Sequence, residues 1–447
     1  MAFDNKLTAG LDKVKQKGVV WLFMLLFVVA TLCLPLFMLV VSFFCKAPYY
    51  NFAYYVFGFI LLTLWTVWFF ANYKRHDFSV FKKPFCLEKL MVWLLLAFLF
   101  WATLSVFFAS DITLALFDGI TGIRHEGLIM YFAYAGILLA STRLVDEKRF
   151  LLMVLLFSST IIVLLAGLND FAKLKFTYLV PFSAGWLNPN HYGYFLAIAS
   201  PASLSVFLLE DKPWLKWYAF GNFALINLAI FFNDTLGVEL SNFVVIIILL
   251  ILLSKKIKGK RAEFILAVGV YLFALCADVL LSKFGFQDEN FLQGLVGLVK
   301  DVFKIGKAPT STETYVAGTN RWGLWLECLR NMRDKPLFGI GINCQWLINP
   351  SLESGRPHNE FLQFGSTMGV PSLLFYAGFA FSVLLLGIKR IKKWDNYTTI
   401  CFSAVIGYLA SSCFGVSLPY TFSIYMVVLG LFVGSVTTKN TKVSVDV

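Results

Sequence analysis

Charged residues are scarce in this chain of 447 residues. They make up 14% of it, whereas soluble domains contain about 25%. Hydrophobic residues make up 59%, and apolar runs of about 20 residues, the length that crosses a bilayer core, recur along the chain. The composition therefore excludes an ordinary soluble domain and predicts an all-α, polytopic membrane protein.

The sequence also lacks the usual marks of a metal or nucleotide site. Its eight cysteines form no C-x-x-C pair and no zinc spacing, and neither an acidic pair with metal-ligand spacing nor a nucleotide-binding glycine loop occurs. We therefore expect no cofactor and no metal. Cys328 and Cys344 share one long loop; either they form a disulfide outside the cytoplasm or they remain separate thiols, because spacing alone does not set geometry.

Apolar runs predict about twelve transmembrane helices, of which the fourth is the shortest. The first run is too long for a signal-peptide core and has no small-residue cleavage site after it, so we expect it to be retained. Residues 1–282 would hold helices one to nine, residues 283–359 a loop, and residues 360–447 helices ten to twelve and a cytoplasmic tail. The expected helices lie at about 19–42, 52–72, 90–109, 127–142, 150–168, 190–209, 214–233, 239–254, 262–282, 360–388, 397–416 and 419–437.

Lysines and arginines gather in alternate loops, such as 255–261 and 389–393. Cytoplasmic loops carry an excess of such residues, so we expect both termini in the cytoplasm and loop 283–359 outside it. The net charge of +12 at pH 7 then follows from topology and does not require nucleic-acid binding. The short loops on the opposite side hold only Lys46, Arg124, Lys173 and Lys175.

Loop 283–359 is too long to be a structureless connection. Apolar residues follow helical spacing between Phe291 and Phe303, which predicts an amphipathic helix lying on the bilayer surface. A second amphipathic helix is expected from Arg321 to Arg333, ending before Pro336. We therefore predict a large extracytoplasmic lid of helices.

Three of the four histidines, His125, His191 and His358, are expected on the outer side. Asn188-Pro-Asn190 places a proline in the first turn of a helix, where its missing N–H is harmless. Free N–H groups at such a helix start favour an anion, and Arg356-Pro-His358 repeats the arrangement at the tenth helix.

Arg124, Arg321 and Arg356, with Asn190 and His191, are therefore candidates to bind a phosphate or pyrophosphate group, because arginine binds phosphate oxygens in a two-pronged fork. Other readings remain for some of them. Arg124 could bind a lipid phosphate at the interface, His191 could cap its helix, and Arg321 could be an ordinary loop charge.

His358 is the candidate general base. In the first turn of a helix, beside arginines, an imidazolium is disfavoured. A histidine that stays neutral at pH 7 can accept a proton from a substrate hydroxyl.

Four segments together resemble the O-antigen ligase and polymerase superfamily of bacterial membrane glycosyltransferases. They are Gly122-Ile-Arg-His-Glu-Gly127, Asn188-Pro-Asn-His191, Asn320-Arg-Trp322 with Asp334-Lys-Pro-Leu-Phe-Gly-Ile-Gly341, and Pro357-His-Asn-Glu-Phe-Leu-Gln363 with Gly369. Each is weak alone, but their order and their placement on one face make the set specific.

The resemblance implies a glycan donor on undecaprenyl pyrophosphate, a glycan or lipid acceptor such as lipid A-core, and no metal or nucleotide. The essential histidine of the family maps onto His358 and its loop arginine onto Arg321, with Asn359 and Glu360 as supporting residues. One departure stands out: where members carry Ser-Arg-Gly, this chain has Thr235-Leu-Gly237.

We therefore expect an inverting, metal-independent ligase in the bacterial inner membrane, with its active site extracytoplasmic and membrane lipid around it. A repeat-unit polymerase of the same superfamily is the first alternative. A lipid-linked glycan flippase or other transporter is the second, although transporters usually place ionisable residues at mid-membrane, whereas here the charges lie near the ends of the runs.

Overall fold

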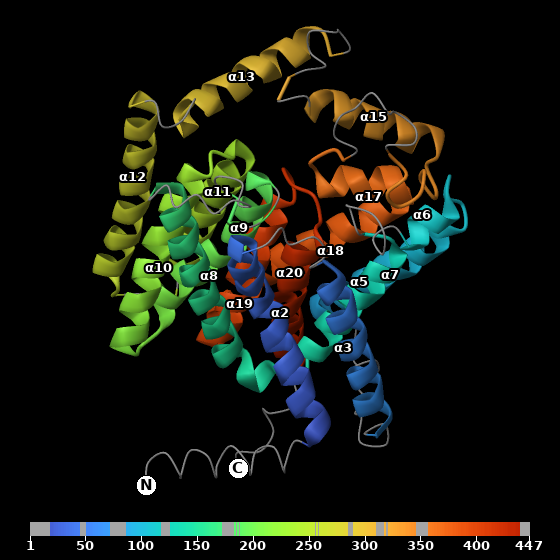
Figure 1. Cartoon of the computed structure of the whole chain (residues 1–447), viewed down its shortest axis with the longest axis horizontal. Coiled ribbons are helices and arrows are strands. Elements are labelled where there is room, and N and C mark those ends of the chain that lie inside the picture. Colours follow the sequence, from blue (N-terminus) through green and yellow to red (C-terminus); the bar gives the residue numbers. More distant parts are fainter. Residues whose placement is uncertain are drawn as a thin grey trace.

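The computed structural model describes most of the chain, and every regular element in the part described is a helix (Figure 1). The described residues are 18–44, 51–71, 86–117, 126–171, 183–184, 186, 188–254, 256–257, 259–284, 289–309, 317–318, 321–345 and 356–438. The helices are α2 (Val19–Phe44), α3 (Asn51–Ala71), α5 (Leu87–Val106), α6 (Ile112–Phe117), α7 (Leu128–Ser141), η2 (Val145–Glu147), α8 (Lys148–Phe171), α9 (Pro189–Leu209), α10 (Pro213–Phe232), α11 (Leu236–Ser254), α12 (Arg261–Lys283), α13 (Phe291–Lys307), α15 (Arg321–Asp334), α17 (Glu360–Met368), α18 (Val370–Arg390), η3 (Ile391–Lys393), α19 (Asn396–Ser411) and α20 (Pro419–Thr438).

Within these ranges, 10 helices are long and apolar enough to cross a membrane. Two of the twelve expected helices are shorter: α7 has 14 residues and α19 has 16. A helix rises about 1.5 Å per residue and a bilayer core is about 30 Å thick, so neither reaches across the core by itself. The all-helical membrane class is confirmed, and the count of twelve stays a prediction.

The prediction of one continuous tenth helix, 360–388, is wrong, because the helix is interrupted at Gly369. This residue has a φ of 88°, which a side chain would strain, and a Cβ there would lie 1.9 Å from the carbonyl oxygen of Leu337. Pro371 follows in the first turn of α18. The backbone N–H of Val370 donates to the carbonyl of Pro336 at 2.8 Å, so the turn after α15 fills the corner between α17 and α18.

Helix α9 is the core of the bundle, since every residue from Tyr192 to Leu209 is buried within the protein. It packs against α10, α11 and α19. Small residues let these backbones approach closely: a Cβ on Gly407 would lie 2.1 Å from the carbonyl oxygen of Ala197. The hydroxyl of Ser205 also donates to that of Ser403 at 2.7 Å, which ties α9 to α19.

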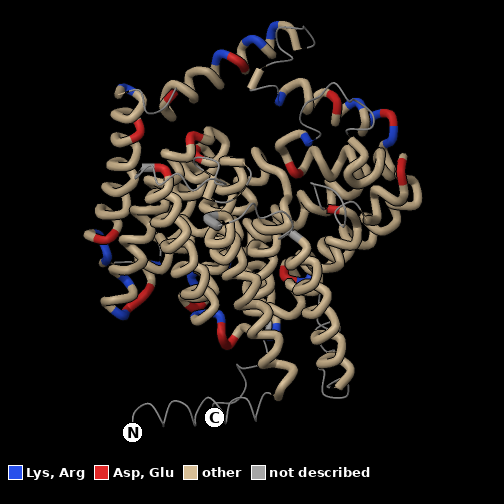
Figure 2. The backbone as a smooth tube through the Cα atoms, viewed as in Figure 1, with Lys and Arg blue, Asp and Glu red and all other residues tan. Residues whose placement is uncertain are grey.

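The charged residues gather at the two ends of the bundle, and the middle is apolar (Figure 2). At one end, Lys148 pairs with Asp395 at 2.9 Å and Arg149 with Glu210 at 3.3 Å. These pairs join the starts of α8 and α19 to the end of α9, so loops predicted on one side do share one end. That this end faces the cytoplasm stays a prediction.

At the opposite end, α13 and α15 lie across the bundle (Figure 1). Asn290 caps α13 by accepting a hydrogen bond from the N–H of Gln293 at 3.0 Å, and an apolar stripe that includes Val299 and Phe303 stays exposed. Both amphipathic helices are thus confirmed as helices. That α13 lies on a bilayer surface stays a prediction.

Candidate functional site

The segment from Arg356 to Asn359 forms a tight turn before α17. The indole N–H of Trp325 on α15 donates to the carbonyl of Pro357 at 2.8 Å. The amide side chain of Asn359 accepts from the N–H of Leu362 at 3.0 Å and so caps α17. The backbone N–H of Glu360 donates to the carbonyl of Ser412 at 2.9 Å. Three neighbouring elements therefore hold the turn in one place.

His358 lies in this turn, one residue before the N-cap, with a φ of 49°. The expectation that it sits in the first turn of a helix is therefore wrong. Its electrostatics nevertheless agree with the expectation of a neutral imidazole. Burial, followed by the nearby Arg321 and Arg356 guanidinium groups, lowers the pKa of His358 to about 4, so the ring is neutral at pH 7.

Arg356 is buried in a pocket of polar groups rather than open to a ligand. Its Nη1 donates to Glu126 Oε2 at 2.7 Å and to the carbonyl of Ser417 at 2.8 Å. Its Nη2 donates to Asn343 Oδ1 at 3.1 Å. Because the fork is occupied by protein groups, the geometry favours a role for Arg356 in holding the turn that carries His358.

Arg321 begins α15 and reaches the start of α11. A Cβ built on Gly237 would lie 3.2 Å from Arg321 Nη1, so the guanidinium rests against the backbone of the first turn of α11. Thr235-Leu-Gly237, where the chain departs from the Ser-Arg-Gly element of the superfamily it resembles, lies at this place. Arg321 therefore supplies a positive charge at a helix start whose own sequence has none.

His191 and Asn190 open α9, and Pro189 occupies its first turn as expected. His191 Nδ1 shares a hydrogen bond with the hydroxyl of Tyr420, and the ring interacts electrostatically with Arg356 and His358. The side chain of Asn190 donates to Asn188 Oδ1 at 2.8 Å, which draws it toward its own helix cap.

The structure thus brings three predicted residues, His191, Arg321 and Arg356, within electrostatic reach of His358. Arg124 and His125 lie outside the described residues.

Glu360 and Asn359, expected as supporting residues, are occupied within the protein. Glu360 is fully buried on α17, where its carboxylate accepts hydrogen bonds from the hydroxyls of Tyr376 at 3.5 Å and Tyr408 at 3.3 Å. Asn359 caps α17. Glu360 is therefore enclosed by protein, and Asn359 shapes the turn that carries His358.

Sequence reasoning missed Glu126, which is 1% exposed and pairs with Arg356. A signal was present, because Glu126 lies in the same Gly-rich segment as Arg124, and a carboxylate among apolar runs requires a partner. The identity of that partner, far along the chain, has no signature in the sequence.

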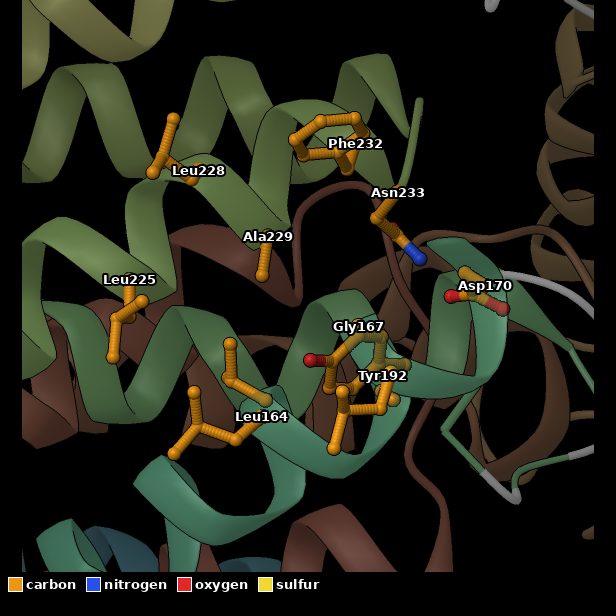
Figure 3. Close-up of a pocket in the computed structure, with 12 residues that line it drawn as sticks. Leu164, Gly167, Asp170, Tyr192, Leu225, Leu228, Ala229, Phe232 and Asn233 are labelled. Atoms are coloured by element: carbon orange, nitrogen blue, oxygen red, sulfur yellow. The ribbon is translucent and has the colours of Figure 1, made fainter. Parts of the chain in front are cut away.

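A separate cavity of about 520 Å³ lies between α8, α9 and α10 (Figure 3). Its walls are mostly leucine, alanine and phenylalanine, and Asp170, Tyr192 and Asn233 gather toward one end. None of the predicted site residues lines it.

The two loop cysteines do not form a disulfide. Cys328 accepts a hydrogen bond from the side-chain amide of Gln345 at 3.2 Å, and Cys344 lies near the carbonyl of Ile342. Both thiols are buried. Among the residues that the structure describes, no three His, Cys, Asp or Glu side chains form a group that could hold a metal ion.

Part of the chain matches a known protein family. Residues 221–377 match the family model described as O-antigen ligase, a region that includes Arg321, Arg356 and His358. No curated protein matches the chain. The match to residues 221–377, together with the many apolar helices, therefore supports the expected resemblance of this multi-pass membrane protein to the O-antigen ligase superfamily.

Proposed function

We propose that this chain is an O-antigen ligase-like glycosyltransferase. It would move a glycan from undecaprenyl pyrophosphate to a sugar hydroxyl, on lipid A-core or an equivalent acceptor, at the extracytoplasmic face of the bacterial inner membrane. The observation that carries the proposal is a histidine kept neutral by burial and by two arginines, inside the region that matches the family.

His358 is the general base of the proposed reaction. Its imidazole takes the proton of the acceptor hydroxyl while that oxygen forms a bond to the anomeric carbon of the donor. The bond between that carbon and the pyrophosphate oxygen breaks, and undecaprenyl pyrophosphate leaves with the electron pair. A single displacement of this kind inverts the anomeric configuration and needs no metal.

Arg321 is the residue best placed to stabilise the leaving pyrophosphate, because its guanidinium lies at the start of α11, where helix N–H groups also favour an anion. Arg124 remains a second proposed ligand. Asn190 and His191 are proposed to line the donor side, since they open α9 beside this cluster. Arg356 holds the turn that carries His358, and its positive charge helps to lower the pKa of His358.

The test is transfer by purified protein in nanodiscs, with a lipid-linked glycan donor and a lipid A-core acceptor. His358→Gln should reduce the rate by about 10²- to 10⁴-fold, the range of general-base catalysis. His76→Gln is the matched control, since the sequence predicts His76 on the other side of the membrane. Full transfer by His358→Gln would remove the base from the proposal.

The polymerase alternative uses the same chemistry with another lipid-linked repeat as acceptor. A deletion strain separates the two activities, because free lipid-linked polymer indicates a ligase and single capped repeats indicate a polymerase. Movement of labelled lipid across the bilayer without glycosyl transfer would instead indicate a transporter.

A further inference from the structure

The carboxylate of Glu126 is the centre of a buried polar cluster. Besides the Arg356 guanidinium, it accepts hydrogen bonds from the hydroxyl of Ser417 at 3.0 Å and from that of Tyr134 at 3.0 Å. Ser417 precedes α20 and Tyr134 belongs to α7. One carboxylate therefore joins two helices to the turn that carries His358.

This cluster is closed to solvent. Glu126 is 1% exposed and Arg356 8% exposed. The other ionisable groups that act on Glu126 from neighbouring elements are Tyr131 of α7, Tyr408 of α19 and Glu360 of α17. Within the described part of the chain, Arg356 is the cation that pairs with Glu126, so ionised Glu126 balances the charge of Arg356 inside the cluster.

We propose that Glu126 is a positioning residue of the transfer reaction, whose carboxylate holds Arg356 and thereby fixes the turn that presents His358. The expected effect on the transfer rate rests on the proposed function, whereas the expected effect on the position of His358 does not. Arg356 is two residues from His358, and breaking a buried pair by removing one partner leaves an uncompensated charge that must move toward water. Such a movement would displace His358.

The proposal also predicts a pH dependence. Burial raises the pKa of Glu126 to about 7, against the opposing effect of Arg356. The pKa of His358 lies well below that value, so the histidine is already neutral throughout this range. The rate should therefore rise with pH through about 7 as Glu126 ionises and pairs with Arg356.

The experiment compares three variants in nanodiscs. Glu126→Gln removes the charge, whereas Tyr134→Phe keeps the charge but removes one hydrogen bond that lowers the pKa of Glu126. Glu88→Gln is the matched control. Glu88, in the first turn of α5, is also buried, and it pairs at 2.7 Å with Arg390, an arginine far away in the sequence. Transfer is measured from pH 5.5 to 8.5, and the His358 imidazole signal is followed by NMR without substrate.

We expect Glu126→Gln to lower the rate at pH 8 by about a hundredfold, the cost of misplacing a catalytic group by about 1 Å, and to abolish the step near pH 7. Tyr134→Phe should move that step to higher pH. Both should shift the His358 signal, whereas Glu88→Gln should change neither the rate profile nor the signal.

The outcomes test the positioning role of Glu126 and the proposed function separately. A His358 signal that stays unchanged in Glu126→Gln overturns the positioning role, whether or not the protein transfers glycans. A shifted signal in a protein with no transfer activity upholds the positioning role and refutes the proposed function instead. If Glu126→Gln does not fold, the pH step of Tyr134→Phe decides, and an unmoved step overturns the inference.

Discussion

Replacing Arg321 with alanine should slow transfer without disabling the base. The guanidinium lies at the start of α11 and also lowers the pKa of His358. Its loss therefore has two effects of different size, which can be measured separately.

The effect on the base is small at pH 8. Without Arg321 the pKa of His358 rises, but burial, which is the largest cause of the depression, remains. Even at the ordinary value near 6.5, more than about nine-tenths of the imidazole is neutral at pH 8. The effect on the leaving group is large, since removing one preformed donor to a developing anion costs about 10²- to 10³-fold in rate.

The assay is single-turnover transfer at pH 8, combined with NMR titration of labelled histidine. With only four histidines in the chain, the His358 resonance can be assigned from His358→Gln. Arg321→Lys, which keeps the charge but loses the fork, should give an intermediate rate. Arg333→Ala is the control on the same helix, because that side chain is 74% exposed. A rate within threefold of wild type for Arg321→Ala, or an unmoved His358 titration, would refute this reasoning.

Three further outcomes follow from the structure. Gly369→Ala should destabilise the protein by roughly 3 kcal/mol or more, because it combines a φ of 88° with a Cβ 1.9 Å from a carbonyl oxygen; Gly269→Ala on α12, which meets nothing within 4 Å, should be neutral or mildly stabilising in the same thermal melt. Acidification from pH 6.5 to about 4 should lower the free energy of unfolding by up to about 3 kcal/mol through His358. A depressed histidine pKa gives stability that is present above pH 6.5 and is lost as the pH falls to the pKa of the folded state. A His358→Gln variant whose stability falls equally over that range would contradict this. Reducing agent should leave the melting temperature unchanged, because Cys328 and Cys344 are not bridged, and a fall in that temperature would show a disulfide.

Much of the fold follows from hydropathy, because an apolar run of span length has few alternatives to a membrane helix. The break at Gly369 was missed although Gly369 and Pro371 marked it. Hydropathy alone places both residues inside one long apolar run, whereas a glycine at positive φ followed by a proline in the first turn of the next helix is a signal for a new helix.

The site was only partly predictable. His358 and Arg321 could be chosen because cations and a histidine were concentrated on one predicted face. The partner of Arg356 could not, since Glu126 lies 230 residues away in sequence and no periodicity connects them. The sequence predicts the start of a helix at His358 for a similar reason. The turn at positive φ is held by contacts from Trp325 and Ser412, and hydropathy carries no sign of either contact.

The enclosure of α9 has a consequence for biosynthesis. Its neighbours include α19 and α20, which are translated long after it. Until they arrive, a segment bearing Ser200, Ser203 and Ser205 must wait beside lipid or the insertion machinery, with hydroxyls that later pack inside protein. Ser205 meets its partner Ser403 only when α19 docks. The enclosure of α9 is therefore complete only after α19 and α20 have been made, and a ribosome that stalls before α19 would leave one side of α9 uncovered.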